Sequence, residues 1–165
     1  MSLIIRQART SDIKDIRAII DEYAAGRRLL TKETVTLYES VQEFTVAEID
    51  GKIVGCGAVH VLWEDLAEVR SVAVKQEVRG KGVGHGILEV LIKRAAELGV
   101  ARIFCLTFET NFFGRHGFVE IEGTPVSPEV YTELLHSYDS GVAEFLDLES
   151  VKPNSLGNIR MLLTL

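Results

Sequence analysis

The chain has 165 residues, of which 47% are hydrophobic and 25% charged, a composition typical of one globular domain and not of a disordered protein. Its 18 basic and 24 acidic residues give a net charge of −6, which argues against nucleic acid as a partner, because nucleic-acid affinity rests on Lys and Arg. No apolar run approaches the roughly 20 residues that span a bilayer and no signal peptide is evident, so we expect no membrane partner and a cytoplasmic location.

The first half of the chain alternates between strand and helix patterns. Thr10, Ser11 and Asp12 supply N-cap side chains, and apolar residues then recur at helical spacing. Asp50-Gly51 joins two strand-like runs and is a strong hairpin signal. In chain order the patterns predict a strand, a helix, a short helix and two strands, over residues 3–8, 13–25, 32–40, 43–49 and 52–61.

The second half continues with a strand, a glycine-rich loop and a long helix that ends at Gly99. The predicted elements are strands at 66–75, 101–107, 118–121 and 159–163, the loop at 80–86, and helices before Gly99, at 111–116 and at 128–137. Four antiparallel strands followed by a strand–helix–strand crossover predict an α/β (α+β) fold with a mixed, mostly antiparallel sheet flanked by helices. We expect residues 1–165 to form a single domain.

The cysteines and histidines do not form a metal-binding pattern. Cys56 and Cys105 each lie in an apolar strand-like run, which is typical of buried, reduced thiols. The four histidines are not spaced as metal ligands, so no metal is expected. His60 and His85 are more typical of structural or solvent-facing side chains than of catalytic ones.

The stretch Arg79-Gly80-Lys81-Gly82-Val83-Gly84 lies between a strand and a helix. A glycine-rich turn at a helix N-terminus directs backbone N–H groups at one point, where phosphate oxygens bind. No Ser or Thr follows a Gly-Lys pair, as a P-loop requires, and alternating glycines do not match a dinucleotide fingerprint. The pattern [RQ]-x-x-G-x-[GA] instead favours the pyrophosphate of coenzyme A, with a purely structural turn as the alternative.

The preceding strand carries two charged residues. Residues 66–74 alternate, so we expect Glu68, Arg70, Val72 and Val74 to share one face. Charges on a central strand are costly unless they are paired or functional. A local Glu68–Arg70 ion pair is one interpretation. The other is a general base beside a cation that binds substrate.

These features together resemble the GNAT superfamily of acetyl-CoA-dependent N-acetyltransferases over nearly the whole chain. Within it the sequence is most similar to the acetyltransferase domain of N-acetylglutamate synthases, in the short single-domain form found in actinobacteria. The stretches that carry this resemblance are residues 37–44 (LYESVQEF), 54–58 (VGCGA), 66–74 (LAEVRSVAV), 106–118 (LTFETNFFGRHGF) and 152–158 (KPNSLGN).

The resemblance implies acetyl-CoA as co-substrate and roles for particular residues. Glu68 would act as general base, directly or through water, and the N–H near Val72 would polarise the thioester carbonyl. Cofactor contacts would come from Val72, Ala73, Val74, Arg79, Gly80, Lys81, Gly82, Val83, Gly84, His85, Asn111 and Phe113. Many relatives place a Tyr acid after the fifth strand, but Asn111-Phe112-Phe113-Gly114 contains none. Either the thiolate leaves without a side-chain acid, or another group acts as that acid. The alternative role of Asn111 is a helix cap, and that of Phe113 is a core residue.

A glutamate acceptor brings two carboxylates, so the site needs further cations. The candidates for binding the acceptor are Lys32, Arg70, Thr107 and Arg160, with Arg27 and Arg28 as additional cations. The predicted function is acetyl transfer from acetyl-CoA to the α-amine of L-glutamate or L-glutamine, the first step of arginine biosynthesis. The alternatives are acetylation of another amine (a protein N-terminus, a polyamine or an antibiotic) and a non-catalytic acyl-CoA sensor. A homodimer is one possible assembly.

Overall fold

A computed structural model describes residues 2–27, 33–146 and 158–165. The chain divides into two compact units. Unit 1 contains residues 1–60 and 69–98, and unit 2 contains residues 61–68 and 99–165. Two strands, β3 (Lys52–Trp63) and β4 (Leu66–Val74), have residues in both units.

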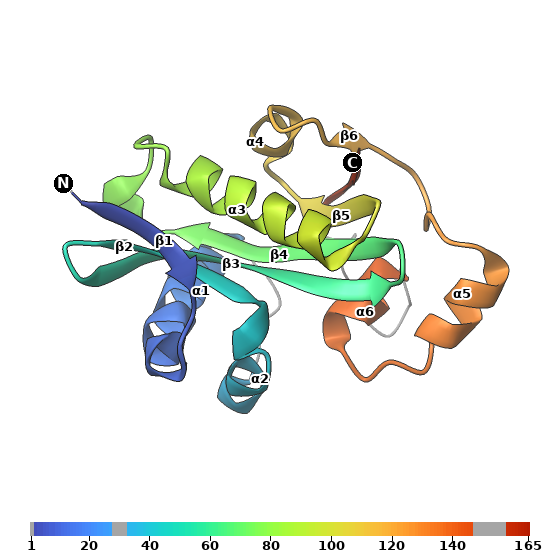
Figure 1. Cartoon of the computed structure of the whole chain (residues 1–165), viewed down its shortest axis with the longest axis horizontal. Helices are drawn as coiled ribbons and strands as arrows, with labels where there is room; N and C mark the ends of the chain where they lie inside the picture. The colour runs from blue at the N-terminus through green and yellow to red at the C-terminus, as the bar shows by residue number, and fades with distance from the viewer. Residues whose placement is uncertain (1, 28–32, 147–157) are drawn as a thin grey trace. The chain divides into compact units, whose positions relative to one another are not determined.

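The other strands are β1 (Leu3–Gln7), β2 (Phe44–Ile49), β5 (Arg102–Thr107), β6 (Val119–Glu120) and β7 (Ile159–Thr164). Hydrogen-bonded neighbours give the strand order β1-β2-β3-β4-β5-β7-β6. Strands β4 and β5 (Arg102–Thr107) are parallel, which is the crossover expected around the long helix, whereas the registers of β1 with β2, β2 with β3, β5 with β7 and β6 with β7 are antiparallel. The predicted mixed, mostly antiparallel sheet is therefore confirmed, with helices beside its strands (Figure 1).

Unit 1 places helices on both faces of its strands. It contains β1 (Leu3–Gln7), β2 (Phe44–Ile49), the helices α1 (Ile13–Arg27), α2 (Thr34–Glu39) and α3 (Val83–Leu98), and the short 3-10 turns η1 (Thr10–Asp12), η2 (Val41–Glu43) and η3 (Gln76–Val78). Helices α1 and α2 lie on one side of the strands and α3 on the other (Figure 1). The α1 face is filled by apolar side chains from α1, α2 and the strands, among them Ile13, Ile16, Leu37, Phe44 and Cys56.

Helix α3 packs on the strands without intervening side chains. A Cβ on Gly55 would lie 2.8 Å from Ile87 Cδ1, and one on Gly57 would lie 2.7 Å from Leu91 Cδ1. Contacts under 3.0 Å require one of the groups to move, so a side chain at either strand position would displace the ends of Ile87 or Leu91. On the helix itself, a Cβ on Gly86 would lie 2.6 Å from Ile5 Cδ1 of β1.

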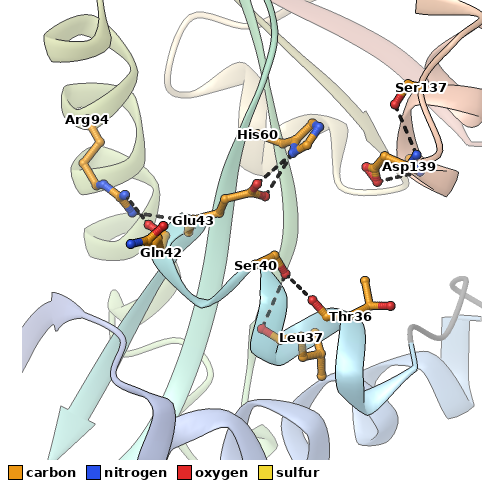
Figure 2. Close-up of polar contacts among 10 residues, drawn as sticks. Thr36, Leu37, Ser40, Gln42, Glu43, His60, Arg94, Ser137 and Asp139 are labelled. Atoms are coloured by element: carbon orange, nitrogen blue, oxygen red, sulfur yellow. Dashed lines mark hydrogen bonds and ion pairs between the residues drawn. The ribbon is translucent and has the colours of Figure 1, made fainter.

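The turn that leads into β2 is fixed by side chains from α3 and β3 (Figure 2). The guanidinium of Arg94 donates to the carbonyl oxygens of Gln42 at 2.7 Å and Glu43 at 3.2 Å, and to Thr45 Oγ1 at 3.3 Å. His60 Nδ1 lies 3.0 and 2.9 Å from the two carboxylate oxygens of Glu43. His60 therefore has a structural partner, as its sequence context indicated.

Unit 2 is built around β5 and β7 (Ile159–Thr164), with β6 (Val119–Glu120) beside β7. Its helices are α4 (Thr110–Gly114), α5 (Pro128–Leu134) and α6 (Ser140–Phe145). Phe104 and Phe145 pack edge to face in its core, with ring centroids 4.8 Å apart. Their buried neighbours include Leu62, Leu66, Leu134 and Val142.

Most elements lie within two residues of their predicted positions, with three exceptions. Helix α3 begins at Val83, inside the expected glycine-rich loop, and α5 ends at Leu134 rather than near residue 137. Helix α6 has no counterpart in the prediction. Both cysteines are buried and free, as expected, and burial raises the pKa of the Cys56 thiol to about 12.

A buried ion pair joins β1 to the start of α1. The Arg6 guanidinium donates to both carboxylate oxygens of Asp12, at 2.8 and 3.1 Å, and also binds Glu48 on β2 at 3.0 Å. Asp12 is 5% exposed and also accepts the backbone N–H of Arg9 at 2.7 Å. The hydrogen bonds from Arg6 lower the pKa of Asp12 below its usual value, against the effect of burial.

We expect Asp12→Asn to destabilise the fold by about 1–3 kcal/mol, because it removes a charged partner from a mostly buried Arg6. Because the pKa of Asp12 is lowered on folding, its contribution is complete above the unfolded pKa of about 4 and is lost as the pH falls further. Thermal unfolding from pH 7 to pH 3 measures both effects. The control is Asp21→Asn, which removes an exposed pair with Arg17 and should change Tm little.

Candidate active site

Strand β4 departs from regular geometry at Ser71, whose φ of 59° lies in the left-handed region. The next residue, Val72, packs on the α3 side, where its Cγ2 would lie 3.3 Å from a Cβ on Gly57. Ala73 is 3% exposed and belongs to the core on the α1 face. Successive side chains of β4 therefore still point to opposite faces after Ser71, but with the alternation reset.

This irregularity corrects one sequence-based expectation. A strand keeps alternate residues on one face only while every residue is extended, and a left-handed residue acts as a bulge. The prediction that Glu68, Arg70, Val72 and Val74 all share a face assumed a regular strand, and Ser71 interrupts that regularity between Arg70 and Val72. Glu68 and Arg70 precede the bulge, so the argument for their shared face still holds.

Glu68 is a buried carboxylate near the start of β4. It is 5% exposed and lies opposite Phe104 in the parallel register of β4 with β5. Burial raises the pKa of the neighbouring Cys105 thiol well above its ordinary value, and the charge of Glu68 adds to this effect. Because burying a carboxylate is costly unless it is paired or functional, both interpretations of Glu68, an ion-pair partner and a chemical group, remain open.

The loop after β4 forms a backbone site suited to an anion. Gly80 and Gly82 both have positive φ, 80° and 81°, and α3 starts at the next residue, Val83. The N–H of Lys81, between them, donates to the Val78 carbonyl oxygen at 3.3 Å, and the N-terminus of α3 adds partial positive charge. Arg79 and Lys81 are exposed and add two formal charges.

The remaining residues predicted for the cofactor lie in the first turn of α3 or beyond β5. The Val83 side chain is 1% exposed, so this residue has only its backbone to offer a cofactor. Gly84 and His85 are half-buried in the first turn of α3. Asn111 lies inside α4, whose N-cap is Glu109, so the alternative role of Asn111 as helix cap is wrong. Phe113 is 5% exposed and packs edge to face with Phe112 and Phe118, as a core residue does.

Two of the residues predicted to bind the acceptor lie in unit 2. Thr107 ends β5 and is 8% exposed, and its Oγ1 accepts the backbone N–H of Glu109 at 2.8 Å. That bond uses an oxygen lone pair and leaves the hydroxyl proton to donate elsewhere. Arg70 is half-buried on β4. Arg28 and Lys32 lie outside the described residues.

Arg160 is held by backbone carbonyls. It is 7% exposed, and its guanidinium donates to the carbonyl oxygens of Gly123 at 2.9 Å, Glu144 at 3.4 Å and Phe145. It also lies 4.9 Å from the centre of the Phe104 ring. These contacts tie the end of α6 to β7, a role that residue spacing did not indicate because α6 was not predicted.

Two further properties concern only the described residues. No group of three or more His, Cys, Asp or Glu side chains within residues 2–27, 33–146 and 158–165 could hold a metal ion. In the same part of the chain, no helix has the length and apolar character needed to cross a membrane.

A strand with a bulge that runs into a phosphate-type loop and a long helix defines an acetyltransferase of the coenzyme A-dependent kind, and comparison with known proteins agrees. The sequence profile described as "Acetyltransferase (GNAT) family" matches residues 13–118. The chain belongs to this family, and the predicted enzyme class is confirmed.

Relatives narrow the similarity further. The chain is 59% identical to the amino-acid acetyltransferase of Mycobacterium tuberculosis, over 98% of this chain and 94% of the relative. The structure of Rv2747 from Mycobacterium tuberculosis, solved in complex with CoA and NLQ, has a TM-score of 0.94 at 59% identity, over 98% of this chain and 99% of that one.

A more distant solved structure shares the fold. N-acetylglutamate synthase from Neisseria gonorrhoeae, complexed with coenzyme A and N-acetyl-glutamate, has a TM-score of 0.78 at 23% identity. The match covers 100% of this chain but only 35% of that protein.

We expect Gly82→Ala to raise the KM for acetyl-CoA about tenfold or more, because a side chain at a φ of 81° disturbs the turn that directs the N–H groups. Steady-state kinetics with acetyl-CoA varied gives this value. Gly99→Ala is the matched control, since Gly99 ends the same helix at a φ of 97° and, like Gly82, has open space around it. Both changes should cost about 1 kcal/mol of stability. An equal effect on KM from the two would contradict the loop assignment.

Proposed function

We propose that this chain transfers the acetyl group of acetyl-CoA to the α-amine of L-glutamate, with L-glutamine as a second acceptor. The observation that carries the proposal is the 59% identity with the amino-acid acetyltransferase of Mycobacterium tuberculosis over nearly the full length of both chains. The proposed place of the reaction is the first step of arginine biosynthesis, in the cytoplasm. We further propose that residues 1–165 act as one catalytic domain, in a monomer or a homodimer.

The cofactor is bound mainly by backbone groups in this proposal. The N–H groups of Gly80, Gly82, Val83 and Gly84 and the side chains of Arg79 and Lys81 bind the pyrophosphate, with His85 beside them. The pantetheine arm runs along Val72, Ala73 and Val74 as an additional strand. The bulge at Ser71 supports this arrangement, because it changes the direction in which the backbone groups of the following residues point. Asn111 and Phe113 add contacts from α4.

Glu68 removes the proton from the acceptor amine. An amino-acid amine is mostly protonated at pH 7 and must lose a proton before its nitrogen can attack the thioester carbon. Glu68 takes that proton directly or through a water, and the N–H of Val72 stabilises the negative charge that develops on the carbonyl oxygen. The burial of Glu68 on β4 supports this role.

Carboxylate recognition falls to Arg70, Lys32 and the hydroxyl of Thr107. Arg70 follows Glu68 by two residues on β4, so an amine at the base has a cation close to its own carboxylate. Arg160 takes a supporting role here, because its donors already serve the carbonyls around α6.

An acceptor panel tests the proposal. With acetyl-CoA fixed and free thiol followed, we expect glutamate and glutamine to be the fastest acceptors, because each has an α-carboxylate and a side-chain carbonyl for the cations. Lysine and polyamines should react slowly, since their added positive charge meets Arg70. Rapid acetylation of a polyamine, with both glutamate and glutamine inert, would leave only the family assignment. If thiol were released only at the rate seen without any acceptor, the activity would be hydrolysis of acetyl-CoA, and the proposed transfer would be contradicted.

Glu68→Gln should lower kcat by about 10² to 10⁴, the usual contribution of a general base. Much of the loss should be recovered at alkaline pH, where the free amine forms without help. The measurement is kcat for glutamate from pH 7 to pH 10. Glu89→Gln, an exposed carboxylate on α3, is the control and should keep the wild-type rate. Wild-type kcat for Glu68→Gln at neutral pH would reduce Glu68 to an ion-pair partner.

A further inference from the structure

Ser71 is one of two non-glycine residues with positive φ among the described residues, and it stands inside a strand. A left-handed conformation is unfavourable for an L-residue with a side chain, and it is found mainly at Gly, Asn and Asp. If β4 needed only a bulge at this position, glycine would supply it with less strain. The presence of serine therefore suggests that the side chain itself is required, since strain of this kind is typical of functional sites.

The packing on either side holds Ser71 in this conformation. The Sγ of buried Cys56 lies 3.5 Å from the Ser71 carbonyl oxygen. Val72 is fixed against the α3 side and Ala73 in the core on the α1 face. The Ser71 side chain is half-buried, and its hydroxyl has no protein hydrogen-bond partner within the described part of the chain. The structure thus fixes the backbone of Ser71 while leaving its hydroxyl available.

The residues assigned so far include no hydrogen-bond donor for the leaving sulfur, and a serine hydroxyl could supply one. Transfer of the acetyl group breaks the carbon–sulfur bond and leaves negative charge on the sulfur of coenzyme A. The segment where many relatives carry a tyrosine contains Phe112 and Phe113, which have no hydroxyl. The N–H of Val72 is assigned to the thioester carbonyl, so its neighbour Ser71 lies one residue from the breaking bond.

We propose that the Ser71 hydroxyl donates a hydrogen bond to the sulfur of coenzyme A as the carbon–sulfur bond breaks. The amine nitrogen, which has already lost one proton through Glu68 to solvent, forms the new bond to the carbonyl carbon and loses a second proton by the same route. The electron pair of the carbon–sulfur bond stays on the sulfur, which leaves as a thiolate stabilised by Ser71 and later takes a proton from solvent. This inference rests on the proposed function for the position of the thioester along β4.

Two variants separate the hydroxyl from the backbone strain. Ser71→Gly removes the hydroxyl and relieves the strain, so we expect kcat to fall about 10- to 100-fold, the effect of one hydrogen bond to a charged group, while Tm rises by about 1–4 °C. Ser71→Ala removes the hydroxyl and keeps the strain, so kcat should fall equally with Tm nearly unchanged. The KM values for acetyl-CoA and acceptor should stay near those of the wild type.

Asp50→Gly is the matched control. Asp50 has a φ of 50° at the turn between β2 and β3, so glycine there should also raise Tm, but kcat should stay the same. If Ser71→Gly behaved like Asp50→Gly, with higher Tm and unchanged kcat, Ser71 would only shape the strand and the proposal would be overturned.

A binding measurement tests the sulfur contact without any acceptor. Calorimetric titration with CoA and with desulfo-CoA is carried out at pH 7 and pH 9.5, on either side of the thiol pKa of about 8.5. For the wild type, the preference for CoA over desulfo-CoA should increase about tenfold at the higher pH, because the hydroxyl binds the thiolate. Ser71→Ala should abolish this increase. An equal increase in both proteins would overturn the proposal, whereas failure of the acceptor panel would overturn only the proposed substrate.

Discussion

The close packing of α3 on the strands of unit 1 is the constraint on which the cofactor loop depends. Gly55 and Gly57 on β3 lie against the side-chain ends of Ile87 and Leu91 of α3, and Gly86 of α3 lies against Ile5 of β1, so closely that an added Cβ would force these side chains to move. The glycines therefore let α3 pack closely on the sheet. Its first turn follows the left-handed residues Gly80 and Gly82, so the N–H groups of that turn are placed by core packing.

Strand β4 combines demands that a regular strand could not meet. Its first residues pair with β5 and bury Glu68, while in the proposed function its last residues present backbone groups to the cofactor. The left-handed residue Ser71 lets both happen within nine residues, because it resets the facing of everything after it. The buried thiol of Cys56 on β3 contacts the carbonyl oxygen of Ser71, so this cysteine has a structural role at the irregular position of β4.

The sequence predicted the fold well where periodicity and glycine signals agree. The hairpin at Asp50-Gly51, the long helix and the parallel strand after it all follow from local patterns. The same reasoning could not separate the glycines of residues 80–86: two have left-handed backbones and one packs against β1, which only the three-dimensional structure distinguishes. The irregularity at Ser71 was also not predicted, because nothing in the sequence of residues 66–74 marks a left-handed residue. The contacts of Arg94 and His60 with the turn at Gln42 and Glu43 were likewise not predicted, because they join residues far apart in the sequence.

The charged residues are distributed unevenly between the two units. Unit 1 holds 14 of the 18 basic residues, whereas unit 2 holds four basic residues and 12 of the 24 acidic ones. A polyanionic cofactor suits the first unit, where the loop lies. In unit 2, Arg102 is bound to Asp65 and the Pro125 carbonyl, and Arg160 to carbonyls around α6. In the proposed function, recognition of an acidic acceptor relies on a few cations such as Arg70, because the net charge of −6 on the whole chain repels such an acceptor. Under that proposal, selectivity comes from local pairing with these cations, and not from the general field.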